Sequence, residues 1–210
     1  MADSKTLKYA DHQADRFTRD LDKVLRGLDR RIIDILNGAT SGGEIEAALI
    51  LNSRPAMIQA LRDSGYYALA EQHAVSYEGA VEALNEAFKD RKLPAPKFSG
   101  ADVTTMKQLA AADIEGLAVI GESAIDELRL SLYRNAVGGS SFPVLVSMVA
   151  AKLEGPLRKH AYTYANTAQL NFSGEILRQA GESLGAEYWE VVGPLDELTR
   201  DECVDALTDP

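Results

Sequence analysis

The feature that most constrains this fold is the spacing of apolar residues near the start of the chain. Apolar side chains recur there at alternating steps of three and four residues: Leu7, Ala10, Ala14, Phe17, Leu21, Val24 and Leu28. This spacing places them on one face of an α-helix and is typical of a coiled-coil seam. The stripe then moves to Ile32 and to Ile35/Leu36, a slip of one position that resembles a stutter. The pattern predicts one long amphipathic helix, which ends at Asn37-Gly38.

Two interpretations of this seam are open. A helix of thirty residues would be about 45 Å long, which is longer than a compact domain of 210 residues needs. The helix either lies along its own bundle, or it projects from the bundle and packs against another chain. In the second case the contact is made by the seam residues Leu7, Phe17, Leu21, Val24 and Leu28.

Most of the remaining chain also shows helical spacing. Apolar residues repeat every three or four positions in a helix that starts at Pro55 and, after an interruption at Ser64-Gly65, within 66–90, 101–137 and 157–184. Gly155-Pro156 is expected to bend or break the chain. Residues 187–193 (EYWEVVG) favour a short strand, because aromatic and β-branched residues lie there between glycines. The predicted fold class is mainly α, an elongated multi-helix bundle with a small C-terminal helix–strand–turn–helix unit.

A candidate linker divides the chain. Residues 92–100 (KLPAPKFSG) contain two prolines and end in glycine, a composition typical of a connection between helical segments. The linker would separate an N-terminal helical region, residues 1–91, which contains the long helix, from residues 101–210, which end in the small C-terminal unit.

Charge and composition exclude several classes of protein. The net charge is −10, and residues 175–210 alone carry ten acidic and two basic side chains. Such a surface repels phosphate, so this segment is a poor candidate for nucleic-acid contact. No apolar run approaches the roughly 18 residues of a membrane span. The single cysteine, Cys203, cannot form an internal disulfide and suits a reducing compartment.

Motifs for catalysis or for cofactor and metal binding are scarce. The three histidines lie on separate predicted helices without a neighbouring cysteine, which gives no support for a metal site. The Gly138–Ser141 run could bind an anion at a helix N-terminus, but a glycine helix end followed by a serine N-cap explains the same residues. Glu122 and Asp126 share a helix face, as solvated pairs often do. We expect no enzyme activity, no catalytic residue, no cofactor and no metal.

The most informative segment is 162–207. Its first half predicts a helix with one apolar face, formed by Tyr164, Ala168, Phe172 or Ile176, and Ala180. The short strand around Trp189 and a Gly193-Pro194 turn follow. Thr199–Glu202 has the T-x-x-E form of a capping box, which would open a short helix with Cys203 on its apolar side.

This segment resembles the phage head-morphogenesis family, the minor head proteins similar to protein F of phage Mu. The resemblance rests on Ala165–Ala168 (ANTA), on the aromatic strand Tyr188–Pro194, and on the D-x-x-T-R-x-x-C run Asp196–Cys203. The signature residues are Tyr188, Trp189, Asp196, Thr199, Arg200 and Cys203. They either fix the fold of a small subdomain or contact a partner. Arg200 stands where the family often has a second cysteine, so the family's metal knuckle is not carried over.

The resemblance implies a virion structural protein that joins the head during assembly. Its partners would be the portal or connector protein and the major capsid protein, with several copies in each particle. It would be located in the head or at the head–tail vertex after assembly in the host cytoplasm, and would influence DNA packaging or ejection. Neither a membrane nor sequence-specific nucleic acid is an expected partner. One alternative is a head-to-tail adaptor that forms a ring of its own. Another is a hydrolase or transferase, which would need convergent polar residues in a pocket.

Overall fold

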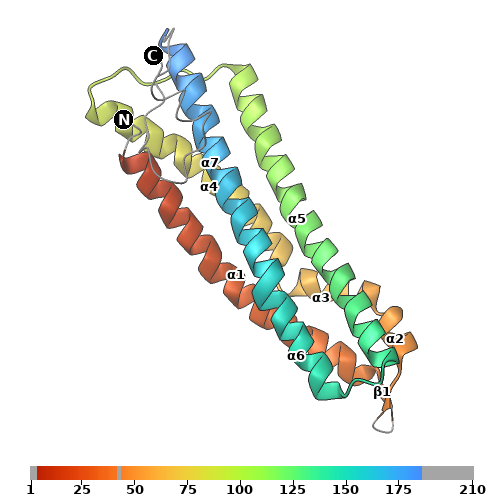
Figure 1. Ribbon diagram of the computed structural model, residues 1–210. Coiled ribbons are helices and arrows are strands. Elements are labelled where there is room, and N and C mark those ends of the chain that lie inside the picture. Colours follow the sequence, from red (N-terminus) through yellow and green to blue (C-terminus); the bar gives the residue numbers. More distant parts are fainter. Residues whose placement is uncertain (1–3, 42–43, 186–210) are drawn as a thin grey trace, which may run out of the picture.

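The computed structural model describes residues 4–41 and 44–185, and this part of the chain is mainly α-helical, as the sequence predicted (Figure 1). Its helices are α1 (Ser4–Gly38), α2 (Ala47–Leu51), α3 (Arg54–Asp63), α4 (Tyr66–Asp90), α5 (Gly100–Val137), α6 (Phe142–Lys152), the π-helix η1 (Leu153–Leu157) and α7 (Arg158–Ser183). Two short strands, β1 (Thr40–Ser41) and β2 (Glu44–Ile45), pair antiparallel, with Thr40 opposite Ile45. The strand predicted at 187–193 lies outside the described residues.

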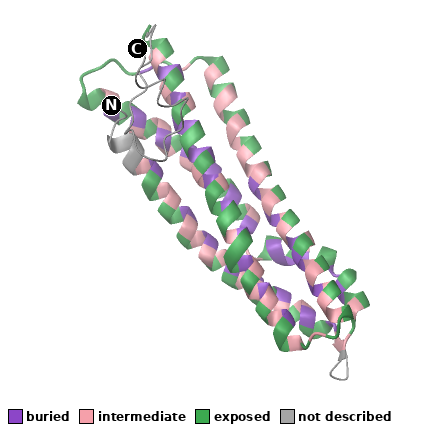
Figure 2. Cartoon of the chain, viewed as in Figure 1, coloured by how far each residue is buried: buried purple, intermediate pink, exposed green. Residues whose placement is uncertain are grey.

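The long helices are arranged side by side along one axis, which makes the described part of the chain elongated (Figure 1). α6, η1 and α7 follow one another without a break and act as a single rod from Phe142 to Ser183. This rod contacts both α1 and α5, and α4 contacts α1 and α5. Buried residues follow the inward faces of these helices, and exposed residues follow the outward faces (Figure 2).

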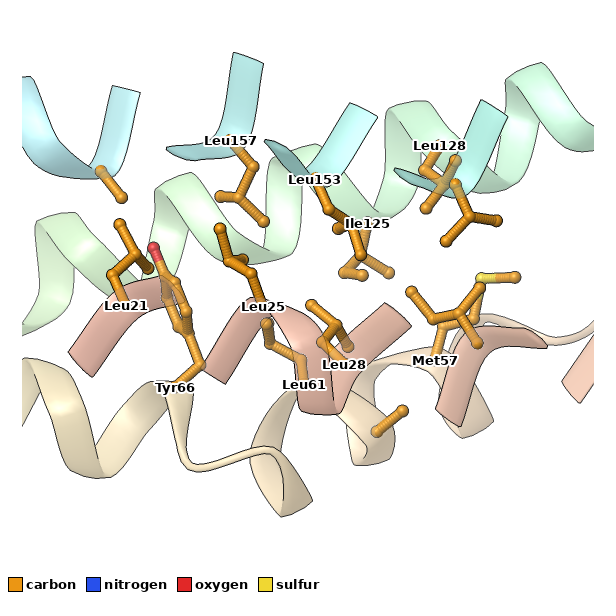
Figure 3. Close-up of a cluster of buried hydrophobic side chains, with 14 of the residues drawn as sticks. Leu21, Leu25, Leu28, Met57, Leu61, Tyr66, Ile125, Leu128, Leu153 and Leu157 are labelled. Carbon is orange, nitrogen blue, oxygen red and sulfur yellow. The ribbon is translucent and has the colours of Figure 1, made fainter. Parts of the chain in front are cut away.

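The apolar face of α1 is buried in the chain's own core. Phe17, Leu21 and Leu28 are at most 5% exposed and belong to one hydrophobic cluster with residues of every other helix. Val24 is half-buried against that cluster, and Leu7 lies within α1. The interpretation that this seam packs against another chain is therefore wrong for Phe17, Leu21 and Leu28, because the chain's own helices cover them. Figure 3 shows α1 side chains among those of the other helices: Leu21, Leu25, Leu28, Leu61, Tyr66, Ile125, Leu153 and Leu157.

The buried positions of α1 follow an eleven-residue spacing. They are Ala10, Phe17, Leu21, Leu25, Leu28, Ile32 and Leu36, followed by Ala39 just after the helix. Leu21 and Ile32 are eleven residues apart, and so are Leu25 and Leu36. This repeat corresponds to about 3.67 residues per turn, close to a straight α-helix, and does not impose a left-handed supercoil. The core position is therefore Leu25 rather than Val24, and the apparent stutter is part of a regular pattern.

The connection between α4 and α5 is non-helical where the sequence predicted a linker. Residues 93–99 have no regular secondary structure, and Ser99 begins α5 with a reciprocal capping box to Asp102. The segment does not separate two cores, however. Residues from both sides of it, such as Tyr66 and Leu132, belong to the same hydrophobic cluster. The connection therefore joins two helices of one bundle.

Three tyrosine rings lie over three helix glycines where neighbouring helices approach closely. A Cβ atom at each glycine would collide with the ring, and the pairs are Tyr9–Gly79, Tyr66–Gly121 and Tyr164–Gly116. Each hydroxyl also donates to the turn before its glycine: Tyr9 to the Ser76 carbonyl (2.6 Å), Tyr66 to the Leu117 carbonyl (3.0 Å) and Tyr164 to the Asp113 carboxylate (3.4 Å). These contacts connect α1 to α4, α4 to α5, and α7 to α5.

The burial of α1 predicts a large stability loss from Leu21→Ala. We expect the free energy of unfolding to fall by about 2–5 kcal/mol, because the removed side chain leaves a cavity in a fully buried site. Val119→Ala, at a position that is 56% exposed on α5, is the control and should change stability by less than about 0.5 kcal/mol. Urea denaturation of the two variants measures both values. A loss below about 1 kcal/mol for Leu21→Ala would contradict the burial of the seam.

The tyrosine–glycine contacts predict opposite effects for two glycine substitutions. A Cβ at Gly121 would lie 2.6 Å from Cε1 of the buried Tyr66 ring, so Gly121→Ala should lower the free energy of unfolding by about 1–3 kcal/mol. A Cβ at Gly174 of α7 would meet no atom within 4 Å. Gly174→Ala should therefore stabilise the protein by about 0.5–1 kcal/mol through helix propensity alone. Thermal unfolding followed by circular dichroism tests the pair, and stabilisation by both substitutions would show that Tyr66 can move.

Candidate functional site

The six signature residues lie outside the part of the chain that the structure describes. They are Tyr188, Trp189, Asp196, Thr199, Arg200 and Cys203. The helix predicted to precede them is present as α7, and its buried face includes Ala168, Phe172, Ile176 and Ala180, with Tyr164 half-buried. α7 ends at Ser183, and Gly185 has a φ of 75°. The first helix of the predicted C-terminal helix–strand–turn–helix unit is therefore confirmed.

Glu122 and Asp126 hold neighbouring helices together. Arg54 of α3 donates from Nε and Nη2 to the two oxygens of Asp126, at 2.8 and 3.0 Å. The Tyr67 hydroxyl of α4 donates to Glu122 Oε1 at 2.7 Å. Burial and, second, the Glu122 carboxylate raise the pKa of Tyr67 to about 12. The pair is engaged by an arginine and a tyrosine rather than simply solvated, and this geometry is structural.

The Gly138–Ser141 run forms the turn between α5 and α6. Gly138 occupies the C-cap of α5, and Gly139 adopts a φ of 80°. Ser141 occupies the N-cap position of α6, but its side chain makes no capping hydrogen bond. The predicted glycine helix end is confirmed, and the serine acts as a cap by position only.

A layer of polar side chains lies between two hydrophobic clusters of the bundle. It separates the large hydrophobic cluster from a smaller one that contains Tyr77, Leu84, Phe172 and Ile176. Its most buried polar members are His73, Gln169 and Ser173, which are 6%, 1% and 7% exposed. The layer is completed by residues of four helices: Tyr9 of α1, Ser76 and Tyr77 of α4, Asp113 of α5 and Tyr164 of α7.

Asp113 is the acceptor at the centre of one half of this layer. The Tyr77 hydroxyl donates to its Oδ2 atom at 2.5 Å, and the Tyr164 hydroxyl donates to its Oδ1 atom at 3.4 Å. Burial, followed by the hydrogen bond to Asp113, raises the pKa of Tyr77, so its phenol stays a neutral donor. A single carboxylate thereby joins α4, α5 and α7.

The other half of the layer surrounds His73. Its ring lies edge-on to Phe17 and Tyr77, with centroids 5.2 and 5.5 Å away. Burial lowers the pKa of His73, and the Asp113 charge and a hydrogen bond to the Ala165 backbone oppose this effect. The Ser76 hydroxyl donates to the His73 carbonyl at 2.6 Å. It does not face the imidazole, so the serine is not activated as a nucleophile.

The space beside His73 is too small for a substrate. Its Nε2 atom has no hydrogen-bond partner among the described residues, and the same holds for Gln169 Nε2 and Ser173 Oγ. The adjoining cavity, lined by His73, Ser76 and residues of α1, measures about 20 Å³. Such a volume admits about one water molecule, whereas ligand pockets measure roughly 300–1,000 Å³. The layer is therefore suited to fixing the register of the helices.

A larger groove lies between α1 and the α6–η1–α7 rod. Its volume is about 570 Å³, and it is lined by Asp22, Leu25, Arg26, Asp29, Arg30, Ala150, Leu153, Glu154 and Arg158. Arg158 donates to both oxygens of Asp22, at 2.6 and 3.2 Å. Burial and, second, the Glu154 carboxylate raise the pKa of Asp29. The groove has the volume of a small-molecule pocket, but such pockets are mostly apolar. The acidic and basic side chains that line this groove are more typical of contact with the polar surface of a macromolecule.

The groove borders the π-helix, where the sequence predicted a bend or break. The chain instead continues through Gly155 and Pro156 as the five-residue η1 turn. Pro156 has no N–H to donate, and the wider π-turn accommodates it without ending the rod. Short π-turns of this kind are often found at functional sites.

Comparisons with known proteins identify no relative, since no family model, no curated protein and no solved structure matches the chain. Across residues 4–41 and 44–185, no group of three or more His, Cys, Asp or Glu side chains could hold a metal ion. Within the same residues, no helix is both long and apolar enough to cross a membrane.

Sequence reasoning missed the polar layer, although the sequence contains a signal for it. His73 and Tyr77 are four residues apart on α4, and Gln169 and Ser173 are four residues apart on α7. Polar residues at this spacing on the apolar face of two helices indicate a shared buried layer. The partner that completes it, Asp113, stands on a third helix and gives no local signal.

The buried His73 predicts a stability loss at mildly acidic pH. Its folded pKa lies below that of the unfolded chain, which is about 6.5. The unfolded chain therefore binds the proton more readily, and the free energy of unfolding should fall as the pH drops from about 6.5 towards 5. His73→Gln, which keeps a neutral hydrogen-bond donor, should weaken this pH dependence. Urea titrations at several pH values measure it, with the exposed His160→Gln as the control. Equal slopes for wild type and His73→Gln would contradict the prediction.

Proposed function

We propose that this chain is a structural protein of a bacteriophage head, a minor head or head-morphogenesis protein that packs on the portal or connector during assembly. The observation that supports this proposal most is α7. The resemblance to the family requires a helix that leads into an aromatic segment, and α7 covers the matching run Ala165–Ala168. Ala165 and Ala168 are 2% and 5% exposed, so the small residues of this run have a packing role.

The position of α7 in the bundle also supports a partner contact by the signature residues. α7 packs against α1, α4 and α5 and is therefore rigidly held. It ends at the same end of the bundle as the start of α1 and the α4–α5 connection (Figure 1). The signature residues, which begin at Tyr188, are attached to that end through Gly185. The contact with the portal would be made there, because the apolar face of α1 is already used inside the fold.

Assembly with portal and capsid proteins tests the proposal. Under this proposal the genome that encodes the chain also encodes a portal and a major capsid protein. The full chain is co-produced with these two proteins, and particles are separated on a sucrose gradient and examined by mass spectrometry. We expect wild type to travel with the proheads. We expect Trp189→Ala to be retained about thirtyfold less, as for an aromatic residue worth about 2 kcal/mol at an interface.

Leu170→Ala is the matched control, since Leu170 is 47% exposed on α7 and lies upstream of the signature. This variant should be incorporated like wild type, and circular dichroism should show equal helicity for all three proteins. Absence of wild type from proheads and virions would overturn the proposal. A free ring of this chain in negative-stain images, added only to filled heads, would favour the adaptor alternative. Multiple-turnover hydrolysis or group transfer by the purified chain would favour an enzyme.

A further inference from the structure

The connection between α4 and α5 is a basic surface on an acidic protein. Residues 89–107 contain five basic and two acidic side chains, although the whole chain has a net charge of −10. We call the basic set the basic connection, and it comprises Lys89, Arg91, Lys92, Lys97 and Lys107. All five of these residues are exposed.

The positive charges of the basic connection are not neutralised by the described part of the chain. None of the five side chains forms an ion pair with another described residue. Elsewhere on the bundle, by contrast, Arg54, Arg158 and Arg178 pair with carboxylates. Asp102, one of the two acidic residues within the segment, is engaged in the capping box of α5. The basic connection therefore has charge available for an acidic partner.

Apolar side chains lie at the same end of the bundle. Leu93, Val103 and Leu184 are 47%, 42% and 39% exposed. Phe98 is only partly buried on the smaller hydrophobic cluster. A segment that covers this end would remove apolar surface from water as well as neutralise charge, and each square ångström of apolar area so buried is favourable.

The end of α7 is in direct contact with this surface. The Lys97 backbone N–H donates to Ser183 Oγ at 3.2 Å. Leu177 of α7 packs on the same cluster as Phe98. The chain beyond Gly185 therefore starts beside the basic connection, where Figure 1 also places the end of α7.

The chain that follows has the complementary composition. Residues 186–210 contain eight acidic side chains and one basic side chain, a net charge of −7. They also contain apolar residues that could cover the exposed leucines and valine: Trp189, Val191, Val192, Leu195, Leu198 and Leu207. Because the segment is tethered at Gly185, its effective concentration at the basic connection is in the millimolar range, so weak contacts suffice to hold it.

We infer that residues 186–210 dock on the basic connection of their own chain. Carboxylates of the segment pair with Lys92, Lys97 and their neighbours, and its apolar residues cover Leu93 and Leu184. The inference does not rest on the proposed phage function, because charge, tether and exposed surface are properties of this chain. Nucleic acid is the competing occupant, since phosphate would also be attracted to five cations that pair with no carboxylate of the described residues.

Trp189 is the single tryptophan of the chain and lies in the docking segment, so its fluorescence reports whether the segment is docked. Acrylamide quenching of its fluorescence is measured in the full chain at low salt. We expect Lys92→Glu/Lys97→Glu to raise the undocked fraction about tenfold, because each reversal removes one exposed ion pair and adds a repulsion of similar size. Quenching should rise accordingly, and wild type in 1 M NaCl should show the same rise, since the Debye length is then about 3 Å.

Arg134→Glu/Lys159→Glu is the matched control, because it changes the net charge equally at exposed positions on α5 and α7 outside the basic connection. It should leave quenching unchanged. Carbodiimide coupling of dilute wild type gives a second readout, with expected cross-links within one chain between Lys92 or Lys97 and acidic residues of 186–210. Equal quenching in all variants and at both salt concentrations would overturn the inference. So would cross-links found only between chains, or duplex DNA that binds the basic connection without changing Trp189.

Discussion

The fold depends on close contact between long helices, and small residues make this contact possible. Gly79, Gly116 and Gly121 each leave space for a tyrosine ring, and α7 buries alanines against its neighbours. Close packing gives the dispersion contacts and the apolar burial that stabilise the bundle. It also removes water from the tyrosine hydroxyls, so each of them must find an acceptor on the neighbouring helix. One contact thus fixes the distance between two helices and their relative position along the axis.

The polar layer extends the same constraint to the region between the two hydrophobic clusters. A purely apolar core would tolerate sliding of one helix along another, because one leucine contact resembles the next. Asp113 can accept from Tyr77 and Tyr164 in one register only. A slip of one turn would leave the half-buried carboxylate without these donors and the buried Tyr77 hydroxyl without its acceptor. Buried polar groups of this kind are expensive when unpaired. The layer costs stability relative to leucines and specifies a single arrangement, which is consistent with a rod that must hold a defined shape.

Much of the helical architecture follows from local sequence, whereas the partners of each helix do not. Asn37-Gly38 ends α1 as the sequence predicted, because a helix stop is local chemistry. The capping box at Ser99 is equally local, although it was not predicted. The periodicity of α1 shows that one face of the helix is buried, but it does not show which elements cover that face. That Leu25 lies on the buried face becomes clear only from its packing against the other helices. The contacts of Tyr9, Tyr66 and Asp113 join positions far apart in the chain. The signature residues lie outside the described part, and they remain a prediction.

The burial of α1 changes what kind of recognition is open to this protein. An apolar seam would bind a partner mainly by the hydrophobic effect, with little dependence on salt. Because Phe17, Leu21 and Leu28 are covered internally, recognition has to use other features of the described surface. These are the charged groove around Arg158 and the cations of the basic connection, which lie next to exposed apolar side chains such as Leu93. Contacts between charged groups steer association and set specificity more than they add affinity, and they weaken as ionic strength rises. A partner that binds at the groove or at the basic connection must carry complementary charges in a fixed pattern. A bundle whose helices are held in one register keeps its own charges in fixed positions and can therefore recognise such a pattern.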